Sequence, residues 1–513
     1  MLTRVFSAAL HGVDAVEVQV EVNEGGGQPK AVIVGLPDAA VKESRDRVFT
    51  ALTNTGLRLP KGRLTISLAP ADLRKEGPSF DLPIALGIAA LARKDFFPED
   101  ALAKCCVAGE LALNGEIRPI KGALSLAIEA KRQGRQAILL PKANAVEAAM
   151  VEGLHVYGLD TLSQAISLLQ GERPVRPEKV DRERLLQERA TYPFDFSDVR
   201  GQNHVRRALE VAISGNHNIL LVGPPGTGKS MMAKRLVTLM PPLTEEEAIE
   251  ATQIHSVAGT LDPSEGFLAT RPFRSPHHTI SDAGLLGGSS HPSPGEVSLA
   301  HHGILFLDEL PEFRRSTLEV MRQPLEDGRV TISRAAGTYT FLSNFLLVSA
   351  MNSCPCGYLG DSRKSCQCAP AQIERYRSKI SGPLLDRIDL QVEVPAVAYG
   401  DLRRDEPAES SASIRERVLR IREIQRRRFA AYPGVTTNAK MDAAELRKFC
   451  KLDSESDKLL EQAMEQLNLS ARAHSRILKV ARTLADMGER ETLSTDDVME
   501  AIQYRSLDRR LWA

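Results

Sequence analysis

The sequence predicts a multidomain protein of the mixed α/β class that ends in an all-helical part. Its 513 residues are enough for three or four domains. Strand-like alternation, as in residues 15–22, is mixed with helix-like runs in two blocks, whereas no strand pattern follows residue 413. A charged stretch with two prolines, residues 171–190, separates the blocks and is typical of a linker. We therefore predict an N-terminal domain at 1–170, a core at 191–398 and a helical domain at 413–513.

The composition is that of a globular protein without a general attraction to polyanions. Hydrophobic residues make up 42% and charged residues 26% of the chain, and 66 basic residues balance 66 acidic ones. A nucleic-acid partner would therefore have to bind at local basic patches. The sequence has no apolar run of about 18 residues, the length of a membrane span, and its first residues lack a signal-peptide core. Seven cysteines, an odd number, favour a reducing compartment, so we expect a cytoplasmic protein without membrane contact.

Residues 223–230 form a phosphate-binding loop of the form G-x-x-x-x-G-K-[ST]. An apolar run, residues 219–222, precedes the loop and a helix-compatible run follows it, which is the context that this motif requires. Its glycines allow backbone N–H groups to face phosphates, and the following helix adds its positive end. Lys229 would reach the β- and γ-phosphates of ATP, and Ser230 would hold Mg²⁺. The predicted nucleotide-binding residues of this loop are Gly223, Pro224, Pro225, Gly226, Thr227, Gly228, Lys229 and Ser230.

Two further apolar runs each end in polar residues suited to ATP hydrolysis. The run 303–307 is followed by Asp308, placed to ligate Mg²⁺ through water, and by Glu309, placed to polarise the attacking water. The run 345–351 is followed by Asn352, whose amide could orient that water beside the γ-phosphate. Together with the phosphate loop, these two strands predict an ATPase.

These elements, taken in order, resemble the AAA+ ATPases, and within them the magnesium-chelatase branch that also contains the MCM helicases. The resemblance implies that Arg387, between a helix and a strand, is a finger that reaches the γ-phosphate of a neighbouring subunit. Arg375 and Arg377 remain alternatives for that role. The resemblance also implies a second sensor arginine on a helix of the C-terminal lid, for which Arg472 is favoured and Arg476 is the alternative.

Two insertions in the core refine this resemblance. Residues 271–298 are rich in Gly, Ser, Pro and His, which is typical of an exposed loop. Residues 328–341 contain two strand-like runs around a turn, and they resemble the β-hairpin that lines the pore of ring helicases in this branch. The resemblance implies that Arg334 on the hairpin, with Arg271 and Arg274 on the first insertion, contacts DNA phosphates. Each arginine could instead satisfy local carbonyl or carboxylate groups.

Four cysteines lie close together directly after Asn352. They form two C-x-C pairs, Cys354 with Cys356 and Cys366 with Cys368, and four thiolates can complete a tetrahedral Zn²⁺ site. Such a zinc ion would be structural, because no open coordination position remains. Four reduced cysteines, or two labile disulfides in an oxidising setting, are the alternatives.

The N-terminal domain resembles the proteolytic domain of Lon, an S5-like α/β fold. Residues 75–80 match the segment that carries the nucleophilic serine of Lon, here Ser79, and residues 109–122 match the segment that leads to its lysine. The lysine position falls on Leu124, which cannot act as a base. We therefore predict a protease fold without protease chemistry, used as a ring scaffold or for DNA contact, as the similar domain of the RadA helicase implies.

The whole arrangement resembles the YifB/ComM group of magnesium-chelatase-like proteins, whose signatures match residues 36–48, 271–281 and 354–368. This resemblance implies a homohexameric ring helicase that hydrolyses ATP to drive branch migration of DNA junctions in natural transformation, with single-stranded and branched DNA as partners. A chelatase-type remodeller of a protein or metal-insertion complex is one alternative. An ATP-dependent protease is the other, against which Leu124 argues. The arginine-rich stretch 413–428 fits a solvated, an intersubunit or a DNA-facing helix equally well.

Overall fold

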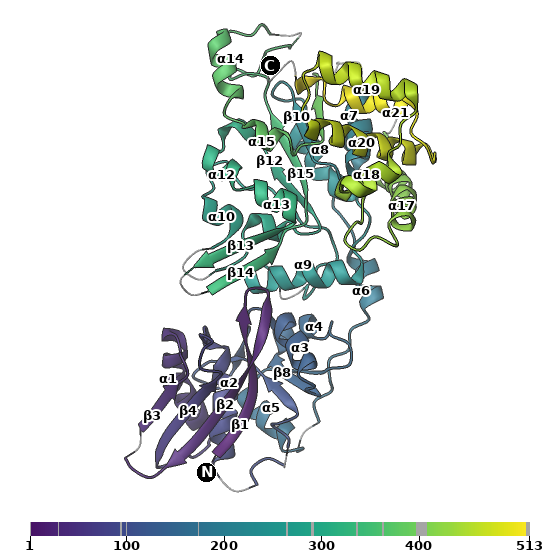
Figure 1. Cartoon of the computed structure of the whole chain (residues 1–513). Helices are drawn as coiled ribbons and strands as arrows, with labels where there is room; N and C mark the ends of the chain where they lie inside the picture. Colours follow the sequence, from purple (N-terminus) through teal and green to yellow (C-terminus); the bar gives the residue numbers. More distant parts are fainter. Residues whose placement is uncertain are drawn as a thin grey trace.

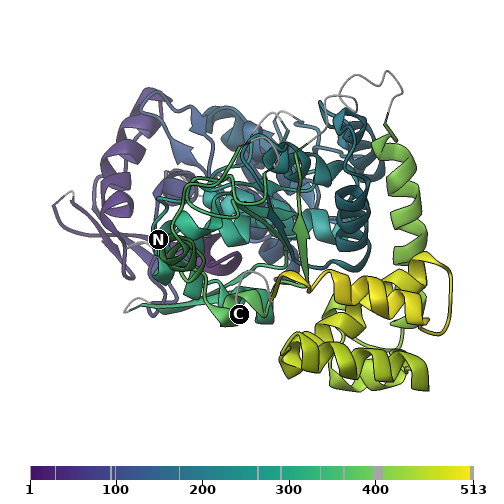
Figure 2. The same ribbon diagram turned by 90° about the horizontal axis from the view of Figure 1, so that it is seen from above.

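In the computed structural model, the chain forms an N-terminal α/β domain, a central α/β core and a helical C-terminal domain (Figure 1). The N-terminal domain lies at one end of the molecule, and the helical domain projects to one side of the core (Figure 2). The structure describes residues 2–28, 30–92, 95–98, 100–172, 174–262, 265–288, 292–334, 337–361, 364–396 and 408–508.

The N-terminal domain is built on a seven-stranded mixed sheet with the order β3-β4-β2-β1-β5-β8-β9. Val18, Val20 and Val22 on the second strand are buried while the residues between them are more exposed, which is the predicted alternation. The strands of this sheet are β1 (Leu2–His11), β2 (Asp14–Gly25), β3 (Lys30–Val34), β4 (Arg63–Ala69), β5 (Cys105–Val107), β8 (Ala137–Pro141) and β9 (His155–Leu159). A short ladder joins β6 (Glu110–Leu111) and β7 (Ile117–Arg118). The helices are α1 (Ala39–Asn54), α2 (Asp81–Ala90), α3 (Ala123–Arg132), α4 (Ala145–Ala148) and α5 (Leu162–Leu169).

The core is built on a five-stranded parallel sheet with the order β11-β12-β15-β10-β16. Its three middle strands are buried along their whole length, as their continuous apolar sequences predict for a parallel sheet covered on both faces. The strands are β10 (Ile219–Val222), β11 (Phe273–Arg274), β12 (Ile304–Leu307), β15 (Leu346–Met351) and β16 (Leu390–Glu393). Beside the sheet, β13 (Arg329–Arg334) and β14 (Gly337–Leu342) form an antiparallel hairpin.

Helices surround the core sheet, and one of them, α9, faces the N-terminal domain (Figure 1). The core helices are α7 (Asn203–Gly215), α8 (Lys229–Arg235), α9 (Glu245–Ala258), α10 (Asp282–Leu286), α11 (Glu296–Leu299), α12 (Arg315–Glu319), α13 (Arg322–Asp327), α14 (Pro370–Arg377) and α15 (Gly382–Leu385). The C-terminal helices are α17 (Ser411–Arg428), α18 (Ala443–Phe449), α19 (Ser454–Gln466), α20 (Ala471–Met487) and α21 (Thr495–Gln503).

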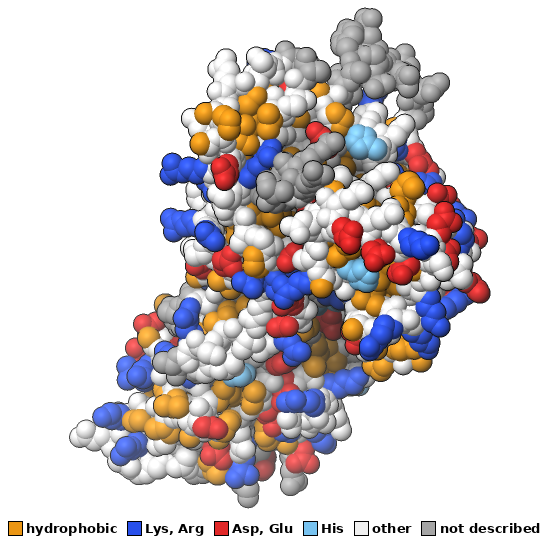
Figure 3. Space-filling view, turned by 45° about the horizontal axis from the view of Figure 1, so that its top comes forward, with side chains coloured by type: hydrophobic (Ala, Val, Ile, Leu, Met, Phe, Trp, Pro, Cys, Tyr) orange, Lys and Arg blue, Asp and Glu red, His pale blue; other side chains and the backbone are white. Residues whose placement is uncertain are grey.

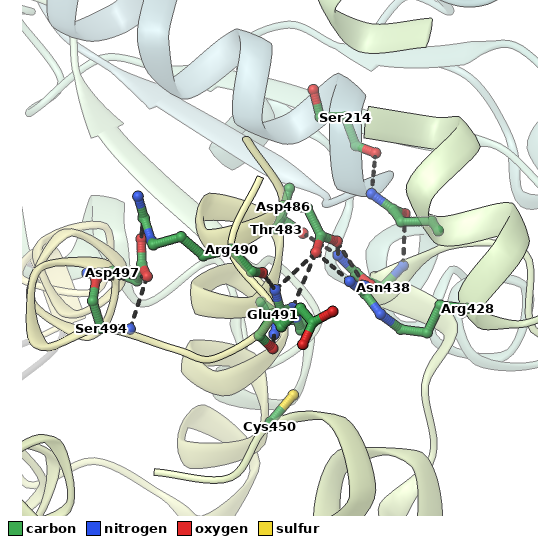
Figure 4. Close-up of polar contacts among 12 residues, drawn as sticks. Ser214, Arg428, Asn438, Cys450, Thr483, Asp486, Arg490, Glu491, Ser494 and Asp497 are labelled. Atoms are coloured by element: carbon green, nitrogen blue, oxygen red, sulfur yellow. Dashed lines mark hydrogen bonds and ion pairs between the residues drawn. The ribbon is translucent and has the colours of Figure 1, made fainter. Parts of the chain in front are cut away.

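A buried polar network fixes the C-terminal helices to one another and to the core. Figure 4 shows Arg428 and Asn438 pointing towards the carboxylate of Asp486, which accepts hydrogen bonds from both side chains, at 2.7 Å and 2.8 Å. The amide of Asn438 also donates to Thr483 (3.0 Å), whose hydroxyl lies 2.7 Å from the ring of His217 in the core. Because buried polar groups are costly unless they are paired, this network favours one orientation of the helices against the core.

Several arginines of α17 are bound within the chain, whereas Arg426 and Arg427 stay exposed, so the solvated, intersubunit and DNA-facing alternatives remain open for the outer side of this helix. Arg417 forms an ion pair with Glu210 (2.7 Å) on α7, and Arg428 pairs with Asp486. Arg422 donates to a backbone carbonyl of the core, and its burial lowers the pKa of this guanidinium to about 9. These contacts make the buried side of α17 a packing surface for α7 rather than a surface for nucleic acid.

The N-terminal domain and the core meet where α3 packs on α9 and where Glu147 of α4 contacts the same helix. The hydroxyl of Ser256 on α9 accepts the N–H of Gly122 (2.9 Å) and donates to the carboxylate of Glu147, which also accepts the N–H of Leu124 (2.8 Å). The side chain of Leu124 is buried in an apolar cluster that includes Phe267 of the core. Residue 124, the position predicted to correspond to the lysine of Lon, therefore serves as a packing contact between two domains.

The predicted linker contains a helix and follows the surface of both domains. The N–H of Glu178 donates to the carbonyl of Val156 (2.8 Å), so this part of the chain lies against the edge strand β9. Helix α6 (Arg182–Arg189) then packs on α9, and Arg182 forms an ion pair with Glu245. The stretch thus adds contacts between the two domains that it connects.

Truncation of the interdomain leucine is expected to destabilise the protein. Leu124→Ala would leave a cavity in the apolar cluster at a cost of about 2–5 kcal/mol, and the N-terminal domain should melt at a lower temperature than in the wild type. Differential scanning calorimetry measures this shift. Leu113→Ala is the matched control, because this leucine is 54% exposed, and equal melting temperatures for the two variants would contradict the packing role.

Candidate functional site

The predicted nucleotide site lies at the carboxyl ends of three neighbouring strands of the core. Because β15 lies between β10 and β12, Asn352 is placed between the phosphate loop and the acidic pair Asp308 and Glu309. A cavity of about 310 Å³ opens here, and its lining includes Lys229, Ser230, Asn352 and both acidic residues. The sheet order thus brings together residues that are far apart in the sequence.

The phosphate loop has the backbone that its glycines predict. Gly226 and Gly228 have positive φ angles of 75° and 86°, which side chains disfavour. A Cβ atom at Gly223 would come within 2.1 Å of the carbonyl oxygen of Val394, so only glycine fits there. The Nζ of Lys229 donates to the carbonyls of Gly223 (2.8 Å) and Pro224 (2.9 Å), and burial lowers the pKa of this lysine against the opposing effect of Asp308.

The groups predicted to hold Mg²⁺ are in contact with each other. The hydroxyl of Ser230 donates to Oδ2 of Asp308 (2.5 Å), and Oδ1 of Asp308 accepts the N–H of Glu309 (2.9 Å). A hydroxyl and a carboxylate, completed by waters and phosphate oxygens, are the ligands that Mg²⁺ prefers. These residues therefore fit a Mg²⁺ ion bound to the phosphates of ATP.

Glu309 and Asn352 reach into the same cavity from adjacent strands. Glu309 has a left-handed backbone with a φ angle of 53°, a conformation uncommon for residues with side chains and often found at functional sites. Its carboxylate is 56% exposed and lies 3.4 Å from Nδ1 of His278. The Oδ1 of Asn352 is 3.3 Å from Nζ of Lys229, so the amide lies beside the lysine of the phosphate loop.

Arg387 lies at the opposite edge of the sheet from the phosphate loop of its own chain. Strands β10 and β16 are parallel with Ile219 opposite Leu390, so the phosphate loop follows one strand while Arg387 precedes the other. At roughly 3.3 Å per residue, this separates the two by more than roughly 10 Å. The guanidinium of Arg387 is buried, and it donates to Glu326 and to the carbonyl of Pro383 (2.5 Å).

The two predicted sensor arginines of α20 lie at the same end of the core strands as Arg387, but they differ in exposure. Arg472 is 61% exposed, with a contact of 3.9 Å to Asp386. Arg476 donates to the buried carboxylate of Asp389 (2.6 Å). Burial alone would raise the pKa of Asp389, but the nearby guanidinium of Arg476 outweighs this effect and holds the pKa well below its usual range. Arg472 is therefore the more accessible of the two.

The alternative finger residues of α14 lie near the nucleotide site of their own chain. Arg377 donates to the carbonyl of Ser353 (3.2 Å), the residue that follows Asn352. Arg375 is exposed on the same helix. The structure therefore separates these two arginines from Arg387, which lies at the other edge of the sheet.

The three arginines predicted to contact DNA have different surroundings. Arg271 is buried, and it donates to the carbonyls of Pro241 and His302 and to Glu247. It therefore has no free guanidinium to offer to DNA, which corrects the prediction for this residue. Arg274 donates through two nitrogens to Glu296, at 2.7 Å each, and this carboxylate neutralises the charge of the guanidinium.

Arg334 remains exposed at the end of β13, and the only contact of its guanidinium found within the described residues is with the carbonyl of Gly288 (2.9 Å). On the face seen in Figure 3, basic side chains are interspersed with acidic ones. That face therefore carries no large area of one charge sign.

The four cysteines of the loop after Asn352 come together as their spacing predicts. All four sulfur atoms lie within 4.8 Å of one another, and Cys366 is 3.6 Å from both Cys354 and Cys356. In a tetrahedral site with Zn–S bonds of about 2.3 Å, sulfurs are roughly 3.8 Å apart. The N–H groups of Tyr358 and Gln367 lower the pKa of Cys356 to about 6, whereas burial and the neighbouring sulfur atoms raise the pKa of Cys366 and Cys368. The cluster therefore fits a four-thiolate metal site.

A second group of potential metal ligands, Glu250, His301 and His302, is better explained as a hydrogen-bonded cluster. The Nδ1 of His301 accepts the N–H of Asn344 (2.9 Å), so its proton lies on Nε2, which faces Glu250 at 3.1 Å. The Nε2 of His302 is 2.6 Å from the same carboxylate. Hydrogen bonds from the two imidazoles lower the pKa of Glu250 well below its usual range, although burial acts in the opposite direction. A protonated Nε2 cannot ligate a metal, so this cluster stabilises the strand ends.

Three family models match the chain along most of its length. The model described as "Magnesium chelatase, subunit ChlI" matches residues 195–402, "Subunit ChlI of Mg-chelatase" matches 19–144, and "Magnesium chelatase, subunit ChlI C-terminal" matches 408–505. The chain is 43% identical to the uncharacterized protein YifB of Escherichia coli and 42% identical to the competence protein ComM of Haemophilus influenzae. Both similarities cover 99% of the chain and 98% of the relative.

The chain belongs to the YifB/ComM family of magnesium-chelatase-like proteins. It is also 31% identical to Lon protease 2 of Bacillus subtilis over 153 residues, which are 28% of the chain and 27% of that protein. These similarities support the Lon-like domain and the AAA+ family, and membership indicates an ATPase that uses ATP and Mg²⁺. Within the described residues, no helix has both the length and the apolar character needed to cross a bilayer.

In this YifB/ComM family member, the sequence did not reveal the partners that hold the predicted residues. Glu326, which binds Arg387, and Glu296, which binds Arg274, stand in segments without a motif. His278 belongs to the first insertion, and its contact with Glu309 depends on how that insertion folds back over the core. The histidine doublet of residues 277–278 was the signal that could have drawn attention to this segment.

Loss of the buried arginine is expected to destabilise the core. Arg271→Ala would leave Glu247 and three backbone carbonyls without their donor, at a cost of about 3 kcal/mol, and the thermal unfolding temperature should fall by several degrees. Arg334→Ala, on the exposed hairpin, should leave that temperature unchanged. Circular dichroism measures the thermal unfolding temperature of both variants. An unchanged temperature for Arg271→Ala would contradict its stabilising role in the core and would make this residue a candidate for DNA contact again.

Proposed function

We propose that this chain is an ATP-driven DNA motor that acts as a homohexameric ring and promotes branch migration of DNA junctions. The observation that carries the proposal is the division of the site between the two edges of the core sheet. Lys229, Glu309 and Asn352 stand at one edge, and Arg387 and Arg472 stand at the other. One subunit cannot bring both sets to one nucleotide, whereas a head-to-tail ring brings the second set of each subunit to the first set of its neighbour.

In the proposed ring, each nucleotide is bound by the phosphate loop and hydrolysed by residues of the same edge. Lys229 binds the β- and γ-phosphates, and Ser230 and Asp308 hold Mg²⁺, which neutralises charge on the phosphates. Glu309 polarises the attacking water, and Asn352 orients it. Arg387 of the neighbouring subunit would have to leave Glu326 to act as the finger, while Arg472 is already exposed.

Two features support DNA as the partner. The relative ComM is a competence protein, which supports a role in natural transformation, and the exposed Arg334 stands on a hairpin that would line the pore of the ring. A remodeller of a protein or metal-insertion complex is the second candidate, because all three matching family models are described as magnesium chelatase subunits. Proteolysis is disfavoured, because Leu124 occupies the lysine position and is buried.

We also propose that the four cysteines hold a structural Zn²⁺ ion that braces the phosphate loop. The support is their close grouping together with the packing of their loop. A Cβ atom at Gly357, in that loop, would lie 2.7 Å from Cδ of Pro225 in the phosphate loop. A rigid metal loop would therefore keep Pro225 and the backbone N–H groups around it in place for the phosphates.

The decisive test of the motor is ATP hydrolysis with and without single-stranded and forked DNA. The wild type should hydrolyse ATP faster with DNA, and Glu309→Gln should lose about 10²–10⁴-fold in kcat under both conditions. Arg334→Ala should lose the response to DNA. Arg274→Ala is the comparison and should keep this response, because Glu296 already neutralises the charge of Arg274. Robust hydrolysis that ignores DNA would favour the remodeller instead.

Metal analysis tests the zinc site. Protein purified without chelator should contain about one zinc ion per chain, and Cys366→Ser should lose the metal, melt at a lower temperature and bind ATP more weakly. Cys105→Ser is the control, because this thiol lies outside the cluster. Metal-free wild-type protein with full ATPase activity would end the claim.

A further inference from the structure

A polar cavity of about 230 Å³ lies where the helical domain meets the amino ends of the core strands. Its lining includes Asn218 before β10, Phe345 before β15, Asp389 before β16, and Lys440 and Lys479 of the helical domain. The phosphate loop follows β10, so the length of this strand, roughly 16 Å, separates the cavity from the nucleotide site of the same chain. The cavity is therefore distinct from that site.

Three cationic side chains line the cavity, and two of them lack a carboxylate partner. Arg476 donates to Asp389 (2.6 Å), whereas Lys479 donates to the backbone carbonyl of Ala439 (2.9 Å). For the ammonium group of Lys440, the described part of the chain provides neither a hydrogen bond nor an ion pair. The cavity therefore holds two positive charges that no adjoining carboxylate neutralises.

The two carboxylates in the lining are already paired with arginines. Asp389 is buried, accepts the N–H of Asn218 (3.0 Å) and is bound by Arg476. Glu326 is bound by Arg387, which does not line the cavity itself. Neither carboxylate can therefore neutralise a lysine unless it leaves its own arginine.

The surroundings of the two lysines disfavour their charged forms. Burial, together with repulsion from Arg476 and Lys440, lowers the pKa of Lys479 to about 8. Burial also lowers the pKa of Lys440, and Arg476 acts in the same direction. An anion in the cavity would offset this penalty, because a nearby opposite charge stabilises a desolvated cation.

A buried hydroxyl group provides a further donor in the same lining. Ser343 is 1% exposed, and within the described residues its Oγ has no hydrogen-bond partner. Buried polar groups are rarely left unpaired in this way, and an oxygen atom of a bound anion could accept this hydrogen bond. The volume is below the ~300–1,000 Å³ of pockets for larger organic ligands, which favours a small ion over a nucleotide.

We infer that this cavity binds a phosphate-sized oxyanion between the ammonium groups of Lys440 and Lys479 and the hydroxyl of Ser343. Lysine binds phosphate as a point charge, and the hydroxyl adds a directed hydrogen bond. The inference goes beyond the proposed motor and does not depend on it, because Lys440, Lys479 and Ser343 have no part in the binding or hydrolysis of ATP.

The test is the binding of inorganic phosphate to the full-length protein, measured by isothermal titration calorimetry. Because the phosphate loop is itself an anion site, it is kept occupied by Mg²⁺ and the non-hydrolysable analogue AMP-PNP. The wild type should bind phosphate under these conditions, and Lys440→Gln and Lys479→Gln should each weaken the binding roughly tenfold or more. Ser343→Ala should weaken it roughly two- to tenfold. Lys458→Gln is the control, because this lysine is exposed and lies outside the cavity.

Thermal unfolding separates a binding role from a structural one. In chloride buffer, Lys440→Gln should melt at a temperature equal to or above that of the wild type, because the substitution removes an unpaired charge. In phosphate of the same ionic strength, the wild type should gain stability through binding, whereas Lys440→Gln should not. A lysine that only supports the fold would instead lower the melting temperature in both buffers, and that result would overturn the inference.

The remaining outcomes also decide the matter. Equal phosphate affinity in the wild type, Lys440→Gln and Lys479→Gln would refute the site, as would the absence of phosphate binding when the nucleotide site is filled. A short single-stranded oligonucleotide should not compete with phosphate, and competition would refute the free ion as the ligand. Hydrolysis of ATP that ignores DNA would refute the motor alone and leave this site standing.

Discussion

The insertion of β15 between β10 and β12 is the constraint on which the site depends. The phosphate loop and the acidic pair belong to strands that are not neighbours, and only the middle strand brings Asn352 between them. Because all three strands are parallel, their carboxyl ends lie at one edge, and the contacts from Ser230 to Asp308 and from Lys229 to Asn352 follow. The apolar sequences that bury these strands therefore also set the geometry of hydrolysis.

The same parallel order explains why one subunit alone would be incomplete in the proposed ring. Residues that precede a parallel strand stand at the edge opposite to those that follow one, so Arg387 and Asp389 cannot approach the phosphate loop of their own chain. The buried network through Asp486, Thr483 and His217 holds α20, and with it Arg472, at that far edge. The fold thus favours a site shared between two subunits over one completed by closure of a single chain.

Residues of local motifs could be predicted from the sequence, whereas residues whose role depends on a distant partner could not. Lys229, Ser230 and Asp308 occupy fixed places in a strand, loop and helix pattern, and the structure brings them together as the pattern requires. Arg271 and Arg334 look alike in sequence, yet the first is buried against backbone carbonyls and the second is exposed. The sequence around an arginine does not identify the partner of its guanidinium, which becomes known only from the fold.

The interdomain contact at Leu124 makes protease chemistry and the present packing mutually exclusive. A lysine base needs a polar neighbour and access to a serine, whereas residue 124 is surrounded by Met150, Leu243 and Phe267 and is closed off by the core. A charged amine in that cluster would lack a partner and would cost several kcal/mol. The Lon-like domain packs on the ATPase core through this buried leucine, and a charged base at position 124 would not be compatible with that packing.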